Sequence, residues 1–258
     1  MPSSKSALGG SVHQLLKGVG DASELVRAVR ARGLAGGLRY GAKVLRGRYL
    51  HRTDRQFDRT FGVDTQGVVE LDELTVEGDA ASGEGYEPTH VVLFARMAAL
   101  LPADLRDYVF VDVGAGKGRV VLLASSYPFK KIIGVEFARE LYTIMQENVR
   151  SYRNPAQRCF SIQLLCMDIA DFSLPEDRLV IYLYNPLMSR FVEDFVEKIR
   201  LSYVRCPRKI IVLFYNPRRE KNVRECFDRA GIFTARQHRD GVFNLLSPYD
   251  LSIFETDA

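Results

Sequence analysis

From Tyr108 onward, apolar β-branched runs alternate with amphipathic stretches, which is typical of a parallel sheet whose strands are joined by helices. The runs predict strands, and the amphipathic stretches between them predict crossover helices. The predicted strands are 109–113, 131–135, 161–166, 179–184 and 209–215, and the predicted helices are 118–126, 138–152, 188–204 and 218–230. The pattern therefore predicts an α/β fold.

The last two apolar stretches follow each other too closely for a crossover. Val242–Leu246 and Leu251–Glu255 are separated only by Ser247 to Asp250. A connection this short joins antiparallel strands. The tail is therefore predicted to be an antiparallel hairpin, and the whole sheet to be Rossmann-like and doubly wound with seven strands.

The N-terminal third has a weaker pattern. It predicts helices over 11–32 and 34–50, although their glycines lower helix propensity by up to about 1 kcal/mol each. Residues 1–10 are small and polar and are predicted to be disordered. Residues 51–85 are predicted to be mainly irregular, and a long loop of this kind is usually a functional cover or a mobile segment.

An amphipathic helix is predicted to begin near Pro88 and to end near Pro102, just before the first strand. This helix belongs with the sheet. We therefore divide the chain into an N-terminal helical extension with a cover loop, residues 1–85, and an α/β domain, residues 86–258.

Positive charge is concentrated in the extension. Residues 1–60 hold twelve Lys and Arg against four Asp and Glu, whereas residues 61–258 hold 24 against 28, so the net charge of +4 hides an asymmetry. The simplest interpretation is a lid or dimer arm with a solvated basic face. The alternatives are contact with acidic lipid, nucleic acid or an acidic substrate.

Composition narrows the class of protein further. The chain has 258 residues, and no apolar run approaches the roughly 20 residues of a membrane span. The N-terminus lacks the apolar region of a signal peptide. Its four cysteines show no C-x-x-C spacing, which predicts a reduced, cytoplasmic setting and no metal site.

The clearest motif is the stretch V-F-V-D-V-G-A-G-K-G-R, from Val109 to Arg119. A buried strand ends in three glycines, Gly114, Gly116 and Gly118, and a helix follows directly. Such a turn points backbone N–H groups and a positive helix terminus at a ligand, and glycine allows the ligand to approach the backbone closely. Asp112, just before the turn, is placed to bind a ligand amine or to order the turn.

Polar residues follow the next two predicted strands. Glu136 lies about twenty residues beyond the glycine turn, where a ribose-binding carboxylate is found in doubly wound sheets. Asp168 follows the third strand, where it either receives an adenine amino group or caps the next helix. Phe137 and Ile169 are the apolar neighbours predicted to lie against the ring faces.

Together these motifs resemble the class I, seven-β-strand, S-adenosylmethionine (SAM)-dependent methyltransferases. The resemblance rests on D-x-G-x-G-x-G, on G-V-E, on the acid after the third strand and on the terminal hairpin, and it covers residues 86–258. It implies SAM as the cofactor and methyl transfer as the reaction. The residues it assigns to the cofactor are Asp112, Gly114, Gly116, Gly118, Glu136, Phe137, Asp168 and Ile169.

A narrower resemblance is to the seven-strand, non-SET lysine methyltransferases. It rests on Tyr86-x-x-Thr89 before the first helix, and it implies that this segment closes over the cofactor. It also implies that Asn185, after the fourth strand, lies near the cofactor and the target amine. Class I amino-methylating enzymes often carry [N/D]-P-P-[aromatic] at that point, whereas this chain reads Y-N-P-L from Tyr184 to Leu187.

The predicted function is methyl transfer from SAM to a nitrogen or oxygen atom of a small molecule. Asn185, Tyr184 and His90 are the candidate catalytic residues, with His90 as a possible base beside the lid. Protein lysine methylation is the first alternative. A SAM-fold protein that binds a partner or RNA without turnover is the second.

Overall fold

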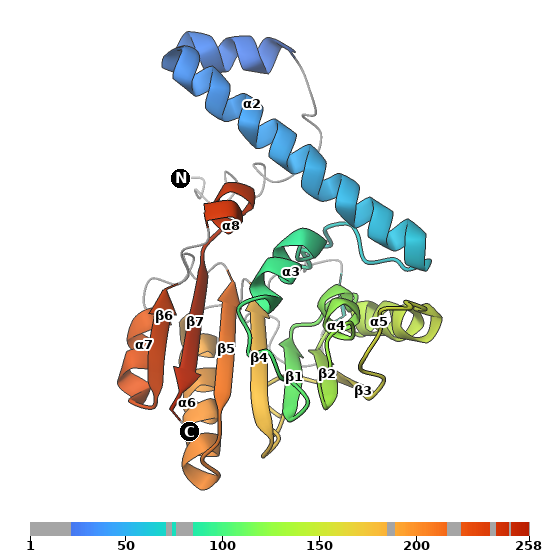
Figure 1. The fold of residues 1–258 in the computed structure, drawn as a ribbon, viewed down its shortest axis with the longest axis vertical. Coiled ribbons are helices and arrows are strands. Elements are labelled where there is room, and N and C mark those ends of the chain that lie inside the picture. The colour runs from blue at the N-terminus through green and yellow to red at the C-terminus, as the bar shows by residue number, and fades with distance from the viewer. Residues whose placement is uncertain are drawn as a thin grey trace, which may run out of the picture. The chain divides into compact units, whose positions relative to one another are not determined.

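In the computed structural model, a seven-stranded sheet organises the chain in the order β3-β2-β1-β4-β5-β7-β6 (Figure 1). The structure describes residues 22–70, 74–75, 85–184, 189–215, 223–237, 241–247 and 249–257. The strands are β1 (Tyr108–Val113), β2 (Lys131–Glu136), β3 (Ile162–Cys166), β4 (Arg178–Tyr184), β5 (Ile210–Tyr215), β6 (Phe233–Gln237) and β7 (Leu251–Thr256). The helices are α2 (Ala22–Phe61), α3 (Val91–Ala98), α4 (Arg119–Ala124), α5 (Arg139–Ser151), α6 (Ser189–Arg205), α7 (Val223–Ala230) and α8 (Gly241–Leu246).

Strands β1 to β5 are parallel, and each agrees with its predicted range to within one residue at either end. Strand β1 lies at the centre, between β2 and β4, and all six of its residues are buried. Continuous burial of this kind is expected where helices cover both faces of a parallel sheet. The strand that precedes the glycine turn is therefore held rigidly on both sides.

Helices cover the two faces of the sheet with different parts of the core (Figure 1). On one face, Val111 of β1 belongs to a cluster that includes Phe195 of α6. On the other face, the ring of Phe110 lies edge-on to Phe94 of α3, with 6.0 Å between the ring centroids. Neighbouring residues of β1 thus face opposite layers, as the pleat of a strand requires.

The C-terminal hairpin is confirmed in its antiparallel pairing but was wrong in its first strand. Strand β7 pairs antiparallel with both β5 and β6. The stretch 242–246, however, is part of helix α8. The strand that pairs with β7 in its place is β6. An apolar run this short fits a helix as well as a strand. As an edge strand, β6 sends only Phe233 and Ala235 towards the core, so its apolar signal is weak.

The N-terminal helices are confirmed at their junction and wrong at their end. Helix α2 contains a kink at Gly33, whose φ of 68° and ψ of −175° are not helical. The kink falls where the sequence separates its two predicted helices; the predicted start at residue 11 lies outside the described residues. The helix runs on to Phe61 rather than ending at Leu50, because Phe57 and Phe61 pack with Tyr152 of α5.

The chain divides into two compact units, Met1–Thr53 and Asp54–Ala258. The predicted boundary between residues 85 and 86 was set by where the methyltransferase motifs begin, not by compactness. It stays a prediction. Within the described residues, no helix combines the length and the apolar character that crossing a bilayer requires.

Candidate active site

A pocket lies at the carboxyl ends of β1, β2 and β4, beside the residues that follow β3. In open α/β sheets this edge is where ligands bind. Residues 85–89, before α3, and Leu74 complete the lining. The predicted site residues that line the pocket are Tyr86, Thr89, Asp112, Gly114, Gly116, Glu136, Phe137, Asp168, Ile169 and Tyr184.

Two predicted site residues are placed differently, and a third is not described. Gly118 and His90 do not line the pocket, although both lie next to residues that do. Asn185 lies outside the described residues. Among the described residues, the structure therefore brings most of the predicted cofactor set to one pocket; of the two described catalytic candidates, Tyr184 lines it and His90 does not.

The glycine turn requires glycine for two separate reasons. All three glycines have positive φ angles, 72° at Gly114, 55° at Gly116 and 84° at Gly118, a region that other residues rarely adopt. Gly116 must also accommodate the ring of Tyr86, since a Cβ atom there would lie 2.3 Å from two ring carbons. Tyr86 thus packs directly over the turn.

Gly118 serves the packing beneath the turn. It is the N-cap of α4, and a Cβ atom there would lie 2.6 Å from Cγ of Met145 on α5. A Cβ atom at Gly134 of β2 would be similarly close to Val121 and Met145. These glycines let α4 and α5 approach the sheet closely, and this approach fixes the position of the turn.

Glu136, at the end of β2, is 3% exposed and ties the two ligand-facing loops together. Its Oε2 accepts a 2.7 Å hydrogen bond from Gly116 N–H, and its Oε1 accepts a 2.8 Å bond from Ala138 N–H. Burial raises the pKa of the Glu136 carboxyl, although these backbone donors counteract the rise. Each carboxylate oxygen has a second lone pair, so Glu136 can still accept hydrogen bonds from a ligand.

Asp112, near the end of β1, is a buried carboxyl whose Oδ2 has no hydrogen-bond partner among the described residues. Burial, together with the charge of Glu136, raises its pKa to about 8. An unpartnered buried carboxyl is costly. A cationic group placed beside it would supply the missing donor and would stabilise its ionised form.

Arg119, the first residue of α4, is 2% exposed and carries positive charge into the same pocket. Its Nε donates a 2.7 Å hydrogen bond to Thr65 Oγ1, and one terminal nitrogen lies 3.2 Å from Asp54 Oδ2. The other terminal nitrogen, NH2, has no hydrogen-bond partner among the described atoms and lies 3.8 Å from Asp58 Oδ1. The guanidinium is therefore anchored by Thr65, Asp54 and Asp58, while Arg119 also lines the pocket.

His90 binds the acid that anchors Arg119. His90 Nδ1 and Asp54 Oδ2 are 2.6 Å apart, and Asp54 Oδ1 accepts a hydrogen bond from Val91 N–H at the start of α3. Burial raises the pKa of Asp54, but the hydrogen bond from His90 and the charge of Arg119 outweigh it and bring the pKa below its usual value. His90 thus helps to hold Asp54 and α3 in place.

The Tyr86–Thr89 segment is fixed at both ends. Tyr86 forms an isolated antiparallel bridge with Val69, and its hydroxyl donates a 2.8 Å hydrogen bond to Thr65 C=O. Thr89 Oγ1 lies 2.7 Å from the hydroxyl of Tyr182 on β4, and its C=O faces Arg119. The segment therefore forms a wall of the pocket that is bonded to the sheet.

The residues that follow β2 and β3 add apolar and polar side chains to the pocket lining. Ile169 is buried and Phe137 is half-buried. Asp168 Oδ1 accepts a hydrogen bond from Ala170 N–H, so this carboxylate caps the turn that follows it. The chain forms a turn here and continues to β4 without a helix, so the alternative that Asp168 caps a helix is wrong. Asp168 does line the pocket, as the adenine-binding alternative requires.

Tyrosines form the far wall, at the end of β4. The ring of Tyr184 lies 4.8 Å from that of Tyr215 and 6.2 Å from that of Tyr249, measured between centroids. Burial raises the pKa of Tyr184 well above its usual value, and the charge of Glu87 adds to the rise. At neutral pH this phenol is therefore a hydrogen-bonding and packing group rather than a base.

The residues that support the turn from behind were missed from the sequence. Asp58 accepts hydrogen bonds from the N–H and the hydroxyl of Thr65, at 2.9 and 2.6 Å. Asn148 of α5 donates to the carbonyl oxygens of Asp64 and Lys117, at 2.7 and 2.8 Å. Asn148 lies three residues after Met145, on the buried face of α5, and that spacing was the available signal.

Known proteins similar to this chain are found among solved structures. No family model and no curated protein sequence matches this chain. Solved structures do. An RNA methyltransferase from Salinibacter ruber, in complex with S-adenosyl-L-homocysteine, is 18% identical over 66% of this chain and 92% of its own, with a TM-score of 0.43.

Two further neighbours are similar to the same degree. A putative O-methyltransferase from Nostoc punctiforme PCC 73102 is 12% identical over 64% of this chain and 56% of its own, with a TM-score of 0.48. Precorrin-6y C5,15-methyltransferase from Geobacter metallireducens GS-15 is 16% identical over 72% of this chain and 95% of its own, with a TM-score of 0.46.

The topology of the sheet decides the fold class. Strand β1 lies at its centre and ends in the glycine turn, β2 and β3 extend to one side, and β4 and β5 extend to the other. Strand β7 lies between β5 and β6 and runs antiparallel to both. The chain has the seven-strand, Rossmann-like fold of the class I SAM-dependent methyltransferases.

Proposed function

We propose that this protein is a SAM-dependent methyltransferase that transfers the methyl group to a nitrogen or oxygen atom of a small molecule. One observation carries the proposal. Two buried polar atoms of opposite character, Asp112 Oδ2 and Arg119 NH2, lack hydrogen-bond partners among the described residues and belong to residues that line one pocket. A ligand with both an ammonium and a carboxylate group complements a pocket lined by a carboxyl and a guanidinium, and SAM carries this pair in its methionine part.

The remaining lining fits the other parts of SAM. Glu136 keeps free lone pairs for a ribose diol, at the position where doubly wound sheets bind ribose. Phe137 and Ile169 offer apolar contacts for an adenine ring, and the free oxygen of Asp168 is available for its amino group. The glycine turn lets the ligand approach the backbone without a Cβ atom in the way.

The protein's part in the reaction is mainly to position the acceptor and exclude water. Bound SAM supplies a sulfonium methyl group that is already activated for attack by a nucleophile, so alignment contributes most of the catalysis. The Tyr86–Thr89 wall, the buried ring of Tyr182 and the half-buried ring of Tyr184 exclude water from the pocket. Tyr184, held neutral by burial, orients the acceptor through its hydroxyl.

The proposed roles of the other catalytic candidates are more limited. His90 acts as a positioning residue, because it holds Asp54 and, through Asp54, Arg119. The role of Asn185 beside the target atom rests on its place directly after β4. A small acceptor is favoured because residues 85–89, which lie outside the sheet, add a further wall to the pocket.

Titration calorimetry tests the cofactor assignment. We expect the chain to bind both SAM and S-adenosylhomocysteine. Glu136→Ala should weaken binding by roughly 1–3 kcal/mol, because charge-assisted hydrogen bonds to the ligand are lost. The matched control is Glu147→Ala, since Glu147 is exposed on α5 away from the pocket lining. If the chain binds neither SAM nor S-adenosylhomocysteine, the proposal is contradicted.

A second assay tests turnover and identifies the acceptor. The chain is incubated with methyl-labelled SAM and with cell extract separated into small-molecule, protein and RNA fractions. We expect label in the small-molecule fraction. Label in protein would instead support lysine methylation, and cofactor binding without label in any fraction would indicate a binding protein.

A further inference from the structure

An apolar stripe is exposed along α2, in the unit that ends at Thr53. Its members are Leu34, Leu38, Leu45 and Tyr49, which are 78%, 76%, 66% and 50% exposed. They are four, seven and four residues apart, a spacing that places them on one side of a helix, within about 60° of arc. Along the helix they extend over roughly 22 Å. Exposed apolar residues gathered on one face mark an interaction surface.

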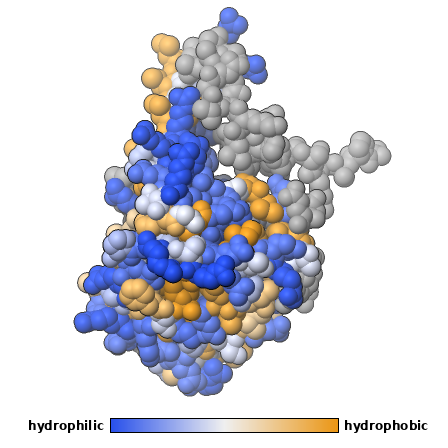
Figure 2. All heavy atoms as spheres, turned by 90° about the vertical axis from the view of Figure 1, so that its right-hand side faces the viewer, coloured by the Kyte–Doolittle hydropathy of each residue, from blue (hydrophilic) through white to orange (hydrophobic). Residues whose placement is uncertain are grey.

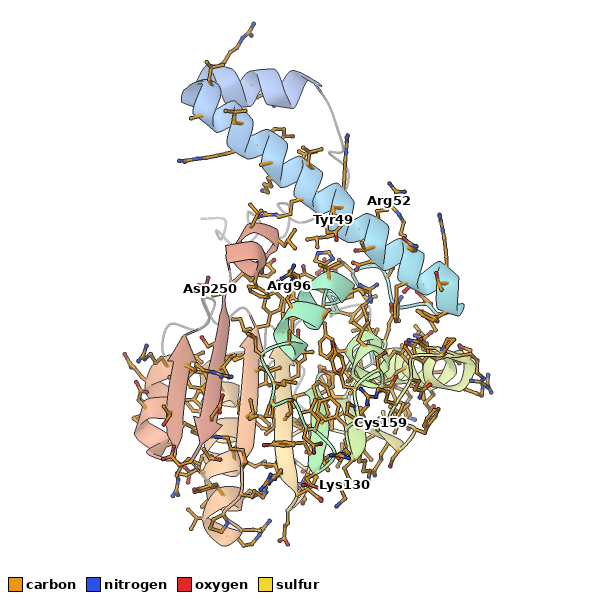
Figure 3. The ribbon with its side chains drawn as sticks, viewed as in Figure 1. Tyr49, Arg52, Arg96, Lys130, Cys159 and Asp250 are labelled. Carbon is orange, nitrogen blue, oxygen red and sulfur yellow. The ribbon has the colours of Figure 1, made fainter. Side chains whose placement is uncertain are left out.

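Positive charge accompanies the stripe without any negative charge. From residue 34 to residue 53 the helix has five Lys and Arg and no Asp or Glu. Arg39, Lys43, Arg48 and Arg52 are all exposed. Tyr49 and Arg52 both project from α2 in Figure 3. In the upper part of Figure 2, hydrophobic side chains lie next to strongly hydrophilic ones along this helix.

The helix is intrinsically weak. Within the same twenty residues it contains Gly36, Gly37, Gly41 and Gly47, and each interior glycine costs about 1 kcal/mol relative to alanine. An exposed helix with this composition gains stability when a surface covers its apolar face. Basic helices with one apolar face are typical of segments that lie in a membrane interface.

Other occupants satisfy only one of the two features. Nucleic acid would neutralise the arginines but would leave the leucines in water. A second copy would cover the leucines but would bring two uncompensated positive helices together. An anionic bilayer surface provides acyl chains for the stripe and phosphate groups for the arginines, and each basic residue near such a surface contributes about 1 kcal/mol.

We propose that residues 34–52 form a membrane-surface helix, through which the protein binds reversibly to anionic lipid. The leucines and Tyr49 enter the boundary between headgroups and acyl chains, and the basic side chains lie among the headgroups. Binding is therefore peripheral and depends on salt. The inference concerns α2 alone and does not depend on the proposed methyl transfer.

Vesicle sedimentation with the full chain tests the proposal. We expect binding to vesicles of phosphatidylcholine with 30% phosphatidylglycerol (about a third anionic lipid, enough to mimic an acidic surface). Pure phosphatidylcholine vesicles should bind at least tenfold more weakly. The variant Leu34→Gln/Leu38→Gln/Leu45→Gln/Tyr49→Gln should lose at least tenfold in binding to anionic vesicles.

The matched control replaces exposed apolar residues elsewhere. Leu201→Gln/Val204→Gln changes side chains of α6 that are 54% and 61% exposed, and it should leave vesicle binding unchanged. Thermal unfolding of each variant shows that the sheet domain remains folded. Equal binding to neutral and anionic vesicles would overturn the proposal, as would unaltered binding of the four-residue variant.

Two further outcomes would overturn it in favour of another occupant. If the wild type is dimeric by analytical ultracentrifugation and the four-residue variant is monomeric, the stripe is an interface between copies. If the wild type binds RNA with a steep salt dependence but leaves vesicles unbound, the basic face serves nucleic acid.

Discussion

Charged side chains cluster both at the pocket edge of the sheet and along the stripe of α2, but they are buried at the pocket and exposed on α2. At the pocket, Asp112, Glu136 and Arg119 are almost fully buried, and each lies in a geometry fixed by strands and glycines. On α2, the side chains of Leu34, Leu38 and Leu45 and of Arg39, Arg48 and Arg52 are exposed. The pocket therefore works through a few groups that are costly to disturb, whereas the stripe works through many weak contacts that add together.

The two regions differ in the hydration of their charged groups. Buried charges require partners, so Arg119 is placed among Asp54, Asp58 and Thr65 even before a ligand arrives. The exposed side chains of α2 keep their water until a partner removes it. Single substitutions should consequently have large effects at the pocket and small effects on α2, and the following predictions test that order.

The largest effect is expected for Arg119→Met. This change leaves Asp54 and Asp58 buried without their cation, so the free energy of unfolding should fall by about 3–5 kcal/mol. Urea denaturation measures it. The control is Arg224→Met, which breaks an exposed pair with Asp228 and should cost less than about 0.5 kcal/mol. Equal losses in the two variants would show that the Arg119 cluster has no special weight.

A smaller effect is expected for Gly116→Ala. Its positive φ is strained for alanine, and the new Cβ atom meets the ring of Tyr86. Gly114→Ala carries the same backbone strain but meets nothing within 4 Å, so it isolates the contact. Gly116→Ala should lower the free energy of unfolding by about 1–3 kcal/mol more than Gly114→Ala does. If the two variants are equally stable in urea, Tyr86 does not rest on the turn in solution.

The third prediction concerns pH. Burial, with the charge of Glu136, raises the pKa of Asp112 to about 8 in the folded chain, above the value of about 3.9 expected when unfolded. Its contribution to stability is therefore complete below about pH 4 and is lost as the pH rises to 8. Relative to Asp112→Asn, the wild type should lose up to about 1.4 kcal/mol per pH unit between pH 5 and 8.

Denaturation of both proteins at several pH values gives this difference, and Asp107→Asn serves as an exposed control. A constant difference between the wild type and Asp112→Asn across the range would mean that Asp112 is already paired or solvated. A slope that disappears when SAM is added would support an ammonium group beside this carboxyl.

The smallest effect is expected for Arg48→Gln on α2. Loss of one basic side chain near an anionic surface should weaken vesicle binding by about fivefold, and the free energy of unfolding should not change measurably. Vesicle sedimentation and urea denaturation of the same preparations test both parts. A loss as large as that of the four-residue variant would mean that Arg48 makes a specific contact. The stripe would then depend on a single group, as the pocket does.

The parallel strands and the glycine turn were determined by the sequence alone. Both depend on short-range causes: apolar runs that suit a strand buried on both faces, and positions that only glycine occupies easily. The kink at Gly33 belongs to the same class. For the same reason the pocket could be located, because the carboxyl ends of parallel strands always meet at one edge of the sheet.

What only the tertiary structure decided depends on partners far along the chain. Helix α2 continues to Phe61 because Tyr152 packs against its end, and β6 exists because β7 offers it a free edge. Arg119 is buried because Asp54, Asp58 and Thr65 surround it, from residues that the sequence indicated were irregular. Local sequence patterns do not encode such distant contacts. The ends of the strands could therefore be predicted from the sequence, whereas the anchoring of Arg119 could not.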